Sequence, residues 1–294
     1  MENKNFYSKV LLFGEYGIIS NSNALSIPFK EFYGFLNKST KLNQDQKHSN
    51  DKLIDLYHFI SNNNNINNAI DLHDLKKDLE SGLHFDSNIP IASGVGSSGA
   101  LVASIFHKYL KTDINNLEIE DIKHLLSIIE SKFHGKSSGL DPLVSFYNKS
   151  ILLSNQKIKL LDDIDYRECN IYLIDSNINA STKKMIEIFN KKMNENDFSK
   201  FFNNVFIRKT NVCIDNLLNY SSSFQDSIKE LSKITFNNFQ EMIPNQIKEK
   251  WEYGLNTNSY FMKLCGSGGG GFFTVFDFQG QVSSKFADFK SFQI

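Results

Sequence analysis

The sequence Pro90-Ile-Ala-Ser-Gly-Val-Gly-Ser-Ser-Gly-Ala100 lies between two segments of different periodicity and decides how the fold is interpreted. Before it, Leu83 to Phe85 is a candidate strand that leads through Asn88 and Pro90 into the loop. After it, apolar residues recur at i, i+4 and i+8 over residues 101–110, which predicts a helix with a broad buried face. The order is therefore strand, glycine-rich loop and helix. Glycines let a backbone approach a ligand closely, and the start of a helix presents N–H groups, so the loop fits a phosphate cradle.

The loop differs from two common nucleotide-binding motifs, and one alternative to ligand binding stays open. No lysine follows the last glycine, so the loop is not a Walker motif. Gly94, Gly96 and Gly99 match a dinucleotide pattern only by spacing, and a tight turn without ligand would need the same glycines. Ser97 and Ser98 add hydroxyls suited to Mg²⁺ or phosphate oxygens, which favours the ligand-binding interpretation.

A second glycine cluster covers Gly266–Gly271, where five of six residues are glycine. Apolar runs at residues 260–265 and 272–278 flank it and predict two strands. So many glycines raise the entropy cost of ordering the backbone. The composition therefore indicates that the backbone passes very close to a ligand or to another segment of the chain.

Three charged residues stand where a structural explanation competes with a chemical one. Glu130 falls on the apolar side of a helix predicted over residues 117–133, although a helix-end glutamate pairing outward with a lysine is an alternative. Asp141 precedes Pro142, and alone it could cap a helix that begins there. Lys9 opens a strand predicted to end at Gly14, a position where lysine is usually solvated. Taken together, the three residues indicate a site.

Length and composition set the broad class. A chain of 294 residues with 40% hydrophobic and 22% charged residues is typical of a globular protein with two domains, which we place at residues 1–165 and 166–294. The net charge of -1 gives no general reason to expect nucleic acid or an anionic membrane as partner. The three cysteines are widely spaced, and no run approaches the length of a signal peptide's apolar region or a membrane span, so we expect a cytoplasmic protein. Residues 182–251 predict three or four helices, interrupted around residues 194–196, 221–223 and 244.

Three motifs together resemble the GHMP small-molecule kinases, in the order in which that family has them. They are Lys9-Val-Leu-Leu-Phe-Gly-Glu-Tyr16, the loop from Pro90 to Ala100, and Lys263-Leu-Cys-Gly-Ser-Gly-Gly-Gly-Gly271. Within the family, Glu130 followed by His134-Gly-Lys-Ser-Ser-Gly-Leu-Asp141 is similar to the mevalonate kinase pattern. The resemblance implies an α+β fold of two domains, the N-terminal one like ribosomal protein S5 domain 2 and the C-terminal one ferredoxin-like.

The resemblance also implies roles for individual residues, with ATP and Mg²⁺ as cofactors. Asp141 would take or orient the proton of the acceptor hydroxyl, and Lys9 would lie close to it and offset charge on the transferred phosphoryl group. Ser98 and Glu130 would ligate Mg²⁺. The residues implied in nucleotide binding are Ser93, Gly94, Val95, Gly96, Ser97, Ser98, Gly268 and Gly269, and those implied in acceptor binding are Glu15, Tyr16, Cys265 and Gly266.

The activity implied is phosphorylation of the terminal hydroxyl of mevalonate to 5-phosphomevalonate, a step in isoprenoid synthesis. Departures from the family pattern concern the acceptor: Tyr16 stands in place of a histidine and Cys265 in place of a threonine, while Tyr7-Ser8 replaces a Pro-Gly pair. Another acceptor, such as phosphomevalonate, a sugar or homoserine, therefore remains an alternative. A nucleotide-binding regulator without turnover is a further one, although a pure binder needs no base such as Asp141. Because relatives are often dimers, the resemblance also implies a homodimer.

Overall fold

The computed structural model describes the chain except residues 1–3, 21, 91–92, 163, 167–168 and 180, and at Ile19 and His134 it describes the backbone alone. The chain divides into two compact units. The first comprises Met1–Lys9, Pro28–Pro90 and Gly96–Lys149, and the second comprises Val10–Ile27, Ile91–Val95 and Ser150–Ile294. Strands β1 (Phe6–Phe13) and β2 (Ala24–Lys38) and the loop before residue 97 therefore each contribute to both units.

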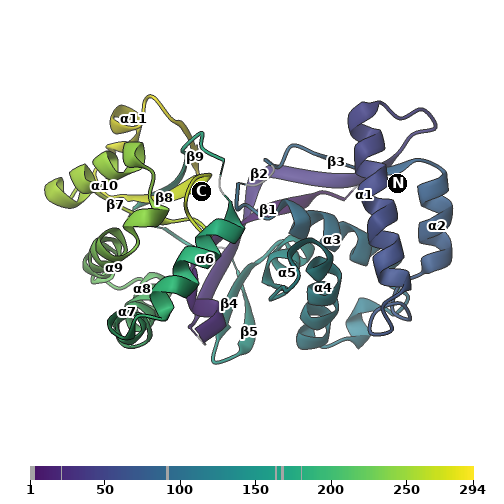
Figure 1. Cartoon of the computed structure of the whole chain (residues 1–294), viewed down its shortest axis with the longest axis horizontal. Coiled ribbons are helices and arrows are strands. Elements are labelled where there is room, and N and C mark those ends of the chain that lie inside the picture. The colour runs from purple at the N-terminus through teal and green to yellow at the C-terminus, as the bar shows by residue number, and fades with distance from the viewer. Residues whose placement is uncertain (1–3, 21, 91–92, 163, 167–168, 180) are drawn as a thin grey trace. The chain divides into compact units, whose positions relative to one another are not determined.

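The first unit packs three helices tightly around one apolar core. Helices α3 (Ser97–Tyr109) and α5 (Leu140–Tyr147) lie side by side, and α4 (Ile119–His134) packs against both (Figure 1). Their buried faces include Val102 and Phe106 of α3, Leu126 of α4 and Leu143 of α5. The helices and strand that belong to this unit alone are α1 (Gln44–Ser61), α2 (Leu72–Glu80), β3 (Leu83–Ser87), α3 (Ser97–Tyr109), the 3-10 turn η2 (Ile114–Asn116), α4 (Ile119–His134) and α5 (Leu140–Tyr147).

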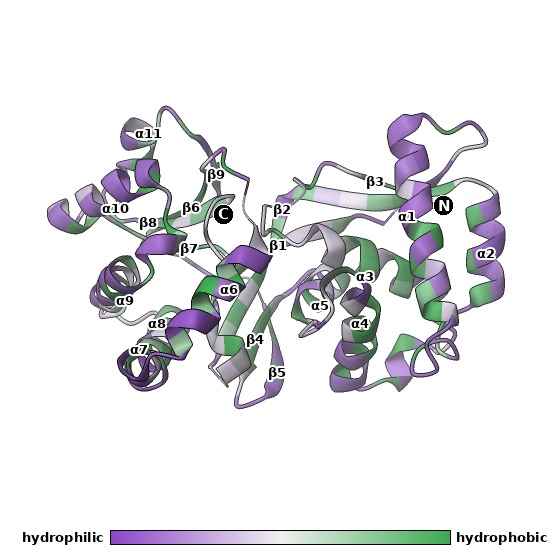
Figure 2. Ribbon diagram, in the orientation of Figure 1, coloured by the Kyte–Doolittle hydropathy of each residue, from purple (hydrophilic) through white to green (hydrophobic). Residues whose placement is uncertain are grey.

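The two long N-terminal strands belong to a five-stranded sheet with the order β1-β2-β4-β5, in which β3 also pairs with β2. In the first unit, residues 34–38 of β2 pair antiparallel with β3, and Asn50 of α1 donates to the Leu83 carbonyl at 2.6 Å. Figure 2 shows that α1 carries both hydrophilic and hydrophobic residues. In the second unit, residues 24–26 of β2 pair antiparallel with β4 (Ser150–Ser154), which pairs in turn with β5 (Lys157–Leu161).

The second unit also contains a four-stranded antiparallel sheet of order β7-β8-β6-β9. Along the chain its elements follow as strand, helices, strand, strand, helix and strand, which is the ferredoxin-like arrangement. Helices α9 and α10 pack on β7 (Figure 1), where Trp251 and Phe261 are buried. The elements are η1 (Gly17–Ser20), β6 (Asn170–Asp175), α6 (Thr182–Met193), α7 (Asn196–Phe201), the π-helical turn η3 (Phe202–Phe206), α8 (Ile207–Leu218), α9 (Phe224–Asn238), η4 (Gln240–Met242), α10 (Asn245–Thr257), β7 (Tyr260–Leu264), β8 (Phe272–Asp277), α11 (Val282–Lys285) and β9 (Lys290–Gln293).

The predicted fold class is confirmed, and most predicted elements lie where periodicity placed them. The region of residues 182–251 forms four helical runs, because α7, η3 and α8 are continuous. Asp141 does not cap a helix beginning at Pro142: α5 begins one residue before Asp141, with Gly139 at the N-cap. Strands β5 and β9 were not predicted, since both are short and carry lysine, and β9 has one apolar residue only. In the part of the chain that is described, no helix is both long and apolar enough to cross a membrane.

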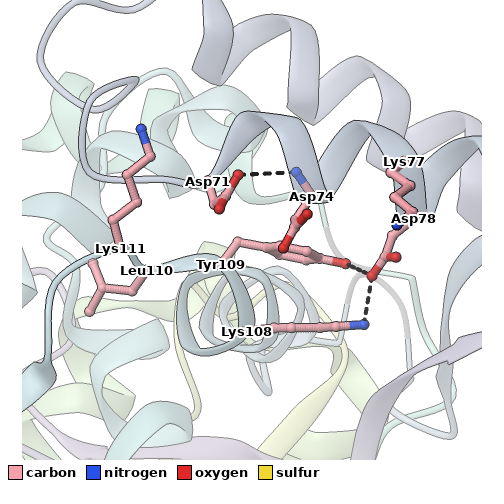
Figure 3. Close-up of a pocket in the computed structure, with 8 residues that line it drawn as sticks. All are labelled: Asp71, Asp74, Lys77, Asp78, Lys108, Tyr109, Leu110 and Lys111. Atoms are coloured by element: carbon pink, nitrogen blue, oxygen red, sulfur yellow. Dashed lines mark hydrogen bonds and ion pairs between the residues drawn. The ribbon is translucent and has the colours of Figure 1, made fainter.

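A charged cluster around Asp78 joins α2, α3 and β2 of the first unit, and Figure 3 shows the contacts between α2 and the end of α3. Asp78 of α2 accepts a hydrogen bond from the Tyr109 hydroxyl at 2.6 Å and pairs with Lys108 at 2.9 Å, both at the end of α3. It also accepts a hydrogen bond from Lys38 of β2. Burial alone would raise the pKa of Asp78, but the hydrogen bonds from Lys38, Tyr109 and Lys108 outweigh it and lower the pKa to about 2. The ionised carboxylate therefore stabilises the folded unit.

Replacing this carboxylate by an amide should destabilise the protein in a pH-dependent way. We expect Asp78→Asn to lose about 1 kcal/mol at pH 7, since partly exposed pairs contribute little individually. The stabilisation is present above the reference pKa of 3.8 and is lost as the pH falls through about 2, so the difference in stability between the two proteins should be smaller at pH 2.5 than at pH 7. Urea unfolding at pH 7 and at pH 2.5 measures this. As a control, Glu80→Gln removes an exposed pair with Lys76 at 4.0 Å and should change stability very little; an equal loss in both variants would contradict the assignment.

Candidate functional site

An ion pair between Lys9 and Asp141 lies at the centre of the predicted site. The Lys9 Nζ and Asp141 Oδ2 atoms are 2.9 Å apart, and the lysine side chain is 6% exposed while the aspartate side chain is 33% exposed. Lys9 comes from β1 and Asp141 from the first turn of α5. Lys9 is thus not a solvated strand end, and its charge faces a carboxylate that remains accessible.

Glu130 of α4 lies in the same unit and is buried, with 4% exposure. Its Oε1 accepts a hydrogen bond from the Ser98 hydroxyl at 3.3 Å, and its Oε2 accepts one from the Ser137 hydroxyl. The alternative of an outward-pointing glutamate that pairs with a nearby lysine is therefore wrong. A buried carboxylate held by two hydroxyl groups is a poised acceptor for a cation.

Two glycines of the loop allow these side chains to approach the start of α3. Gly96 is the N-cap of α3 with φ +82°, and a Cβ atom there would lie 2.8 Å from Lys9 Cγ. A Cβ atom on Gly99 would lie 2.9 Å from the Asp141 carbonyl carbon. Because real Cβ atoms essentially never come so close to other heavy atoms, both positions need glycine to bring Lys9 and Asp141 against the loop.

The protonation of Glu130 depends on its surroundings. Burial, and then the negative charge of Asp141, raise the pKa of Glu130 to about 7. The hydrogen bonds from Ser137 and Ser98 and the charge of Lys9 act in the opposite direction. When Glu130 is ionised, two carboxylates and one lysine leave an excess of negative charge, which an added cation would compensate.

The residues present fit Mg²⁺ and a nucleotide. Among the described residues, no three His, Cys, Asp or Glu side chains gather as a metal site. Mg²⁺ does not need such a cage, because it commonly binds one or two protein oxygens and keeps water or phosphate as its other ligands. Glu130 and Ser98 offer oxygens of this kind. For phosphate, Gly96 has no side chain to cap the first turn of α3, so the helix start can present its amides.

The second glycine cluster packs closely inside the second unit. The amide of Gly269 donates to the Met242 carbonyl at 2.6 Å, and that of Gly271 donates to the Ile178 carbonyl at 2.7 Å. A Cβ atom on Gly271, which has φ +62°, would lie 2.9 Å from the Ser93 carbonyl oxygen. The segment therefore needs glycine because it packs directly against the backbone of other segments. One of these is the start of the glycine-rich loop before α3.

The residues predicted to contact an acceptor differ in accessibility. Glu15 is buried and bonded to Lys263, whose Nζ also donates to the Leu264 carbonyl at 2.8 Å. Cys265 is 3% exposed, whereas a Cβ atom built on Gly266 would have none of the described residues within 4 Å apart from its two chain neighbours. Their contact with an acceptor stays a prediction.

Tyr16 is fixed by its ring and by its hydroxyl. The ring stacks on Phe189 with 4.3 Å between centroids, and the hydroxyl donates to the Ser267 carbonyl at 2.6 Å. Burial and the Glu15 charge raise the pKa of Tyr16, so its phenol stays neutral. Tyr16 therefore links the end of β1 to the second glycine cluster within the second unit.

Of the sequence-predicted residues, the structure brings Lys9, Ser98, Glu130 and Asp141 together in the first unit. Gly96, Ser97 and Ser98 belong to that unit, whereas Ser93, Gly94 and Val95 belong to the second, as do Glu15, Tyr16, Cys265, Gly266, Gly268 and Gly269. Ile91 and Ala92 of the loop motif lie outside the described residues. The contacts of Ser137 with Glu130 and of Lys263 with Glu15 were not predicted. Both residues stand inside motifs, but nothing in a sequence says which carboxylate a hydroxyl or an amine will reach.

Residues 64–149 match the model of the GHMP kinases N-terminal domain. None of the curated proteins matches the chain. Solved structures similar over nearly the whole chain include L. major mevalonate kinase in complex with R-mevalonate, at 18% identity and a TM-score of 0.67 over 98% of this chain and 90% of that one. Methanococcus jannaschii mevalonate kinase has 17% identity and a TM-score of 0.63, and the match covers 99% of this chain and 96% of that one. Streptococcus pneumoniae phosphomevalonate kinase in complex with phosphomevalonate and AMPPNP has 14% identity and a TM-score of 0.64 over 100% of both chains.

The raised pKa of Glu130 predicts how stability varies with pH in metal-free protein. Between the reference pKa of 4.5 and about 7 the folded protein binds a proton that the unfolded chain does not, so stability should fall as the pH rises through this range. Glu130→Gln removes the titrating group and should melt at a higher temperature than the unsubstituted protein at pH 8, but not at pH 4.5. Thermal unfolding in EDTA from pH 4.5 to pH 8 measures this, with the exposed Glu120→Gln as control. Parallel curves for the unsubstituted protein and Glu130→Gln would show that Glu130 does not titrate in this way.

Proposed function

We propose that this chain, which carries a GHMP kinase N-terminal domain and has the GHMP kinase fold, is an ATP- and Mg²⁺-dependent kinase that phosphorylates the terminal hydroxyl of mevalonate. The observation that carries the proposal is the Lys9–Asp141 ion pair at 2.9 Å in the same unit as Glu130 and Ser98. A nucleotide-binding regulator would have no use for an accessible carboxylate held beside a buried lysine.

In this proposal Asp141 acts on the acceptor hydroxyl. Its carboxylate accepts or orients the hydroxyl proton while the acceptor oxygen forms a bond to the γ-phosphorus, and the bond from that phosphorus to the leaving oxygen of ADP breaks. A positioned base of this kind contributes about 10² to 10⁴ in rate. Lys9 holds the Asp141 carboxylate and adds positive charge where the phosphoryl group passes.

Glu130 and Ser98 would hold Mg²⁺ through the oxygens that now share a hydrogen bond. Bound there, Mg²⁺ would supply positive charge that offsets the phosphate oxygens of the nucleotide. Ser93 to Ser98 would bind those phosphates through backbone amides at the start of α3. Gly268 and Gly269 belong to the segment that packs beside Ser93, so their proposed part in nucleotide binding includes holding the loop.

Mevalonate is the proposed acceptor because a sequence motif and the overall structure are both similar to those of mevalonate kinases. The spacing from Glu130 to Asp141 is similar to that of mevalonate kinases. Mevalonate kinases are among the similar structures, one of them in complex with R-mevalonate. Tyr16 and Gly266 are then the proposed acceptor contacts, with Glu15 and Cys265 supporting them from buried positions. Phosphomevalonate is the second candidate, because the similar phosphomevalonate kinase spans this chain completely.

An acceptor panel tests the proposed function. ADP release should be measured with ATP, Mg²⁺ and each of mevalonate, phosphomevalonate, homoserine and galactose. We expect turnover with mevalonate. Turnover with phosphomevalonate alone would replace the acceptor by the second candidate. ATP binding without turnover on any acceptor would favour the regulator instead.

Replacing the proposed base tests the mechanism. Asp141→Asn keeps the shape of the side chain but removes its charge and basicity, so we expect kcat to fall about 10²- to 10⁴-fold while ATP still binds. Steady-state kinetics and equilibrium binding of ATP provide the two measurements. The matched control is Asp121→Asn, an exposed aspartate on α4, which should leave kcat unchanged. Unchanged turnover in Asp141→Asn would show that the base has been assigned wrongly.

A further inference from the structure

We propose that Ser137 is a positioning residue that fixes the Glu130 carboxylate and joins it to the turn that presents Asp141. The inference rests on the proposed function, since it concerns how two groups of that site are held relative to each other. Ser137 lies in the connection between α4 and α5 and has no direct role in the mechanism above. The argument comes from its two hydrogen bonds.

The first hydrogen bond fixes the rotation of the Glu130 side chain. Ser137 donates to Oε2, and Ser98 donates to Oε1 at 3.3 Å. One donor precedes Glu130 in the sequence and lies in the first turn of α3, and the other follows it in the connection after α4. With one donor on each oxygen, the plane of the carboxylate is set, and Oε1 is directed to the Ser98 hydroxyl with which it would share a cation.

The second hydrogen bond fixes the turn before α5. The Gly139 amide donates to Ser137 Oγ at 2.9 Å, and this hydrogen bond closes a local turn from Ser137 to Gly139. Gly139 is the N-cap of α5 with φ +73°, and a Cβ atom on it would lie 2.4 Å from the Lys123 carbonyl oxygen. The turn is therefore pressed against α4, and Asp141 follows it in the first turn of α5.

One hydroxyl group thus connects the proposed metal ligand to the start of the helix that carries the proposed base. Loss of this hydroxyl would leave Glu130 Oε2 buried without its serine donor, and buried polar groups that lose a partner are costly. The carboxylate would then rotate or tilt to find another donor, and the Gly139 amide would lose its acceptor. Side chains that orient a metal ligand typically change metal affinity about 10- to 100-fold.

The test compares three variants of the full chain. Ser137→Ala removes both hydrogen bonds, Ser137→Thr keeps the hydroxyl, and Ser131→Ala removes a hydroxyl from the same region of α4 that donates to the Ile128 carbonyl at 2.6 Å instead. The first readout is equilibrium binding of a fluorescent ATP analogue at increasing Mg²⁺ concentration. The second is amide hydrogen exchange over residues 137–141 in metal-free, nucleotide-free protein.

We expect Ser137→Ala to need about tenfold more Mg²⁺ for the same nucleotide binding, with unchanged binding in EDTA, and to exchange faster over residues 137–141. Ser137→Thr should restore both properties, and Ser131→Ala should alter neither. A Ser137→Ala protein with an unchanged Mg²⁺ requirement would overturn the inference, because a serine that only stabilises the turn would give faster exchange alone.

The two proposals fail in different ways. Nucleotide binding by the unsubstituted protein that does not respond to Mg²⁺ would overturn the kinase proposal and, with it, the metal-related part of this inference. Hydrogen exchange does not depend on the activity, so it decides separately whether Ser137 holds the turn. Unchanged exchange in Ser137→Ala would overturn that part even in an active kinase.

Discussion

The close approach of the start of α3 to β1 and α5 is the constraint on which the first unit depends. At Gly96 the loop lies against the aliphatic part of Lys9, and at Gly99 helix α3 lies against the backbone of Asp141. Larger residues at either position would separate the helix from the two charged groups. The glycines of the loop therefore do more than expose amides to a phosphate, since they also determine where the ion pair lies relative to those amides.

The packing of α3 against β1 and α5 brings two carboxyl groups and one lysine together in a partly buried site. Glu130 is almost fully buried, and Asp141 is close enough for its charge to raise the pKa of Glu130 further, while Lys9 compensates only one of the two carboxylates. Charges that are removed from water need partners, and here the partners are a lysine and two serine hydroxyls. With Glu130 ionised, a bound cation would compensate the remaining charge, which is the physical argument for the proposed Mg²⁺ site.

In the second unit a few side-chain contacts and close backbone approaches fix the glycine cluster. Lys263 holds Glu15 from the strand that leads into the cluster, and Tyr16 holds the carbonyl of Ser267 inside it. Gly271 then passes the backbone of Ser93 at a distance that excludes a side chain. The end of β1, the cluster and the first residues of the loop are thus kept together by side-chain contacts from one short segment and by the small size of glycine.

Periodicity and residue type in the sequence were sufficient to predict a mixture of strands and helices, among them the helices α3 and α4 and the strands β1, β7 and β8, and to single out Lys9, Glu130 and Asp141. These features follow from local rules: an apolar stripe at helical spacing, a short apolar run, or a glycine cluster between strands. The α+β class came from the resemblance of three motifs to the GHMP kinases. Only the tertiary structure decided that Glu130 is buried, that Lys9 bonds Asp141 and that Ser137 connects Glu130 to Gly139. Strand β9 was missed because its pairing with β6, more than its sequence, makes it a strand. The physical reason is common to these cases: a hydrogen bond or ion pair between distant residues depends on how whole elements pack, and no local pattern records that packing.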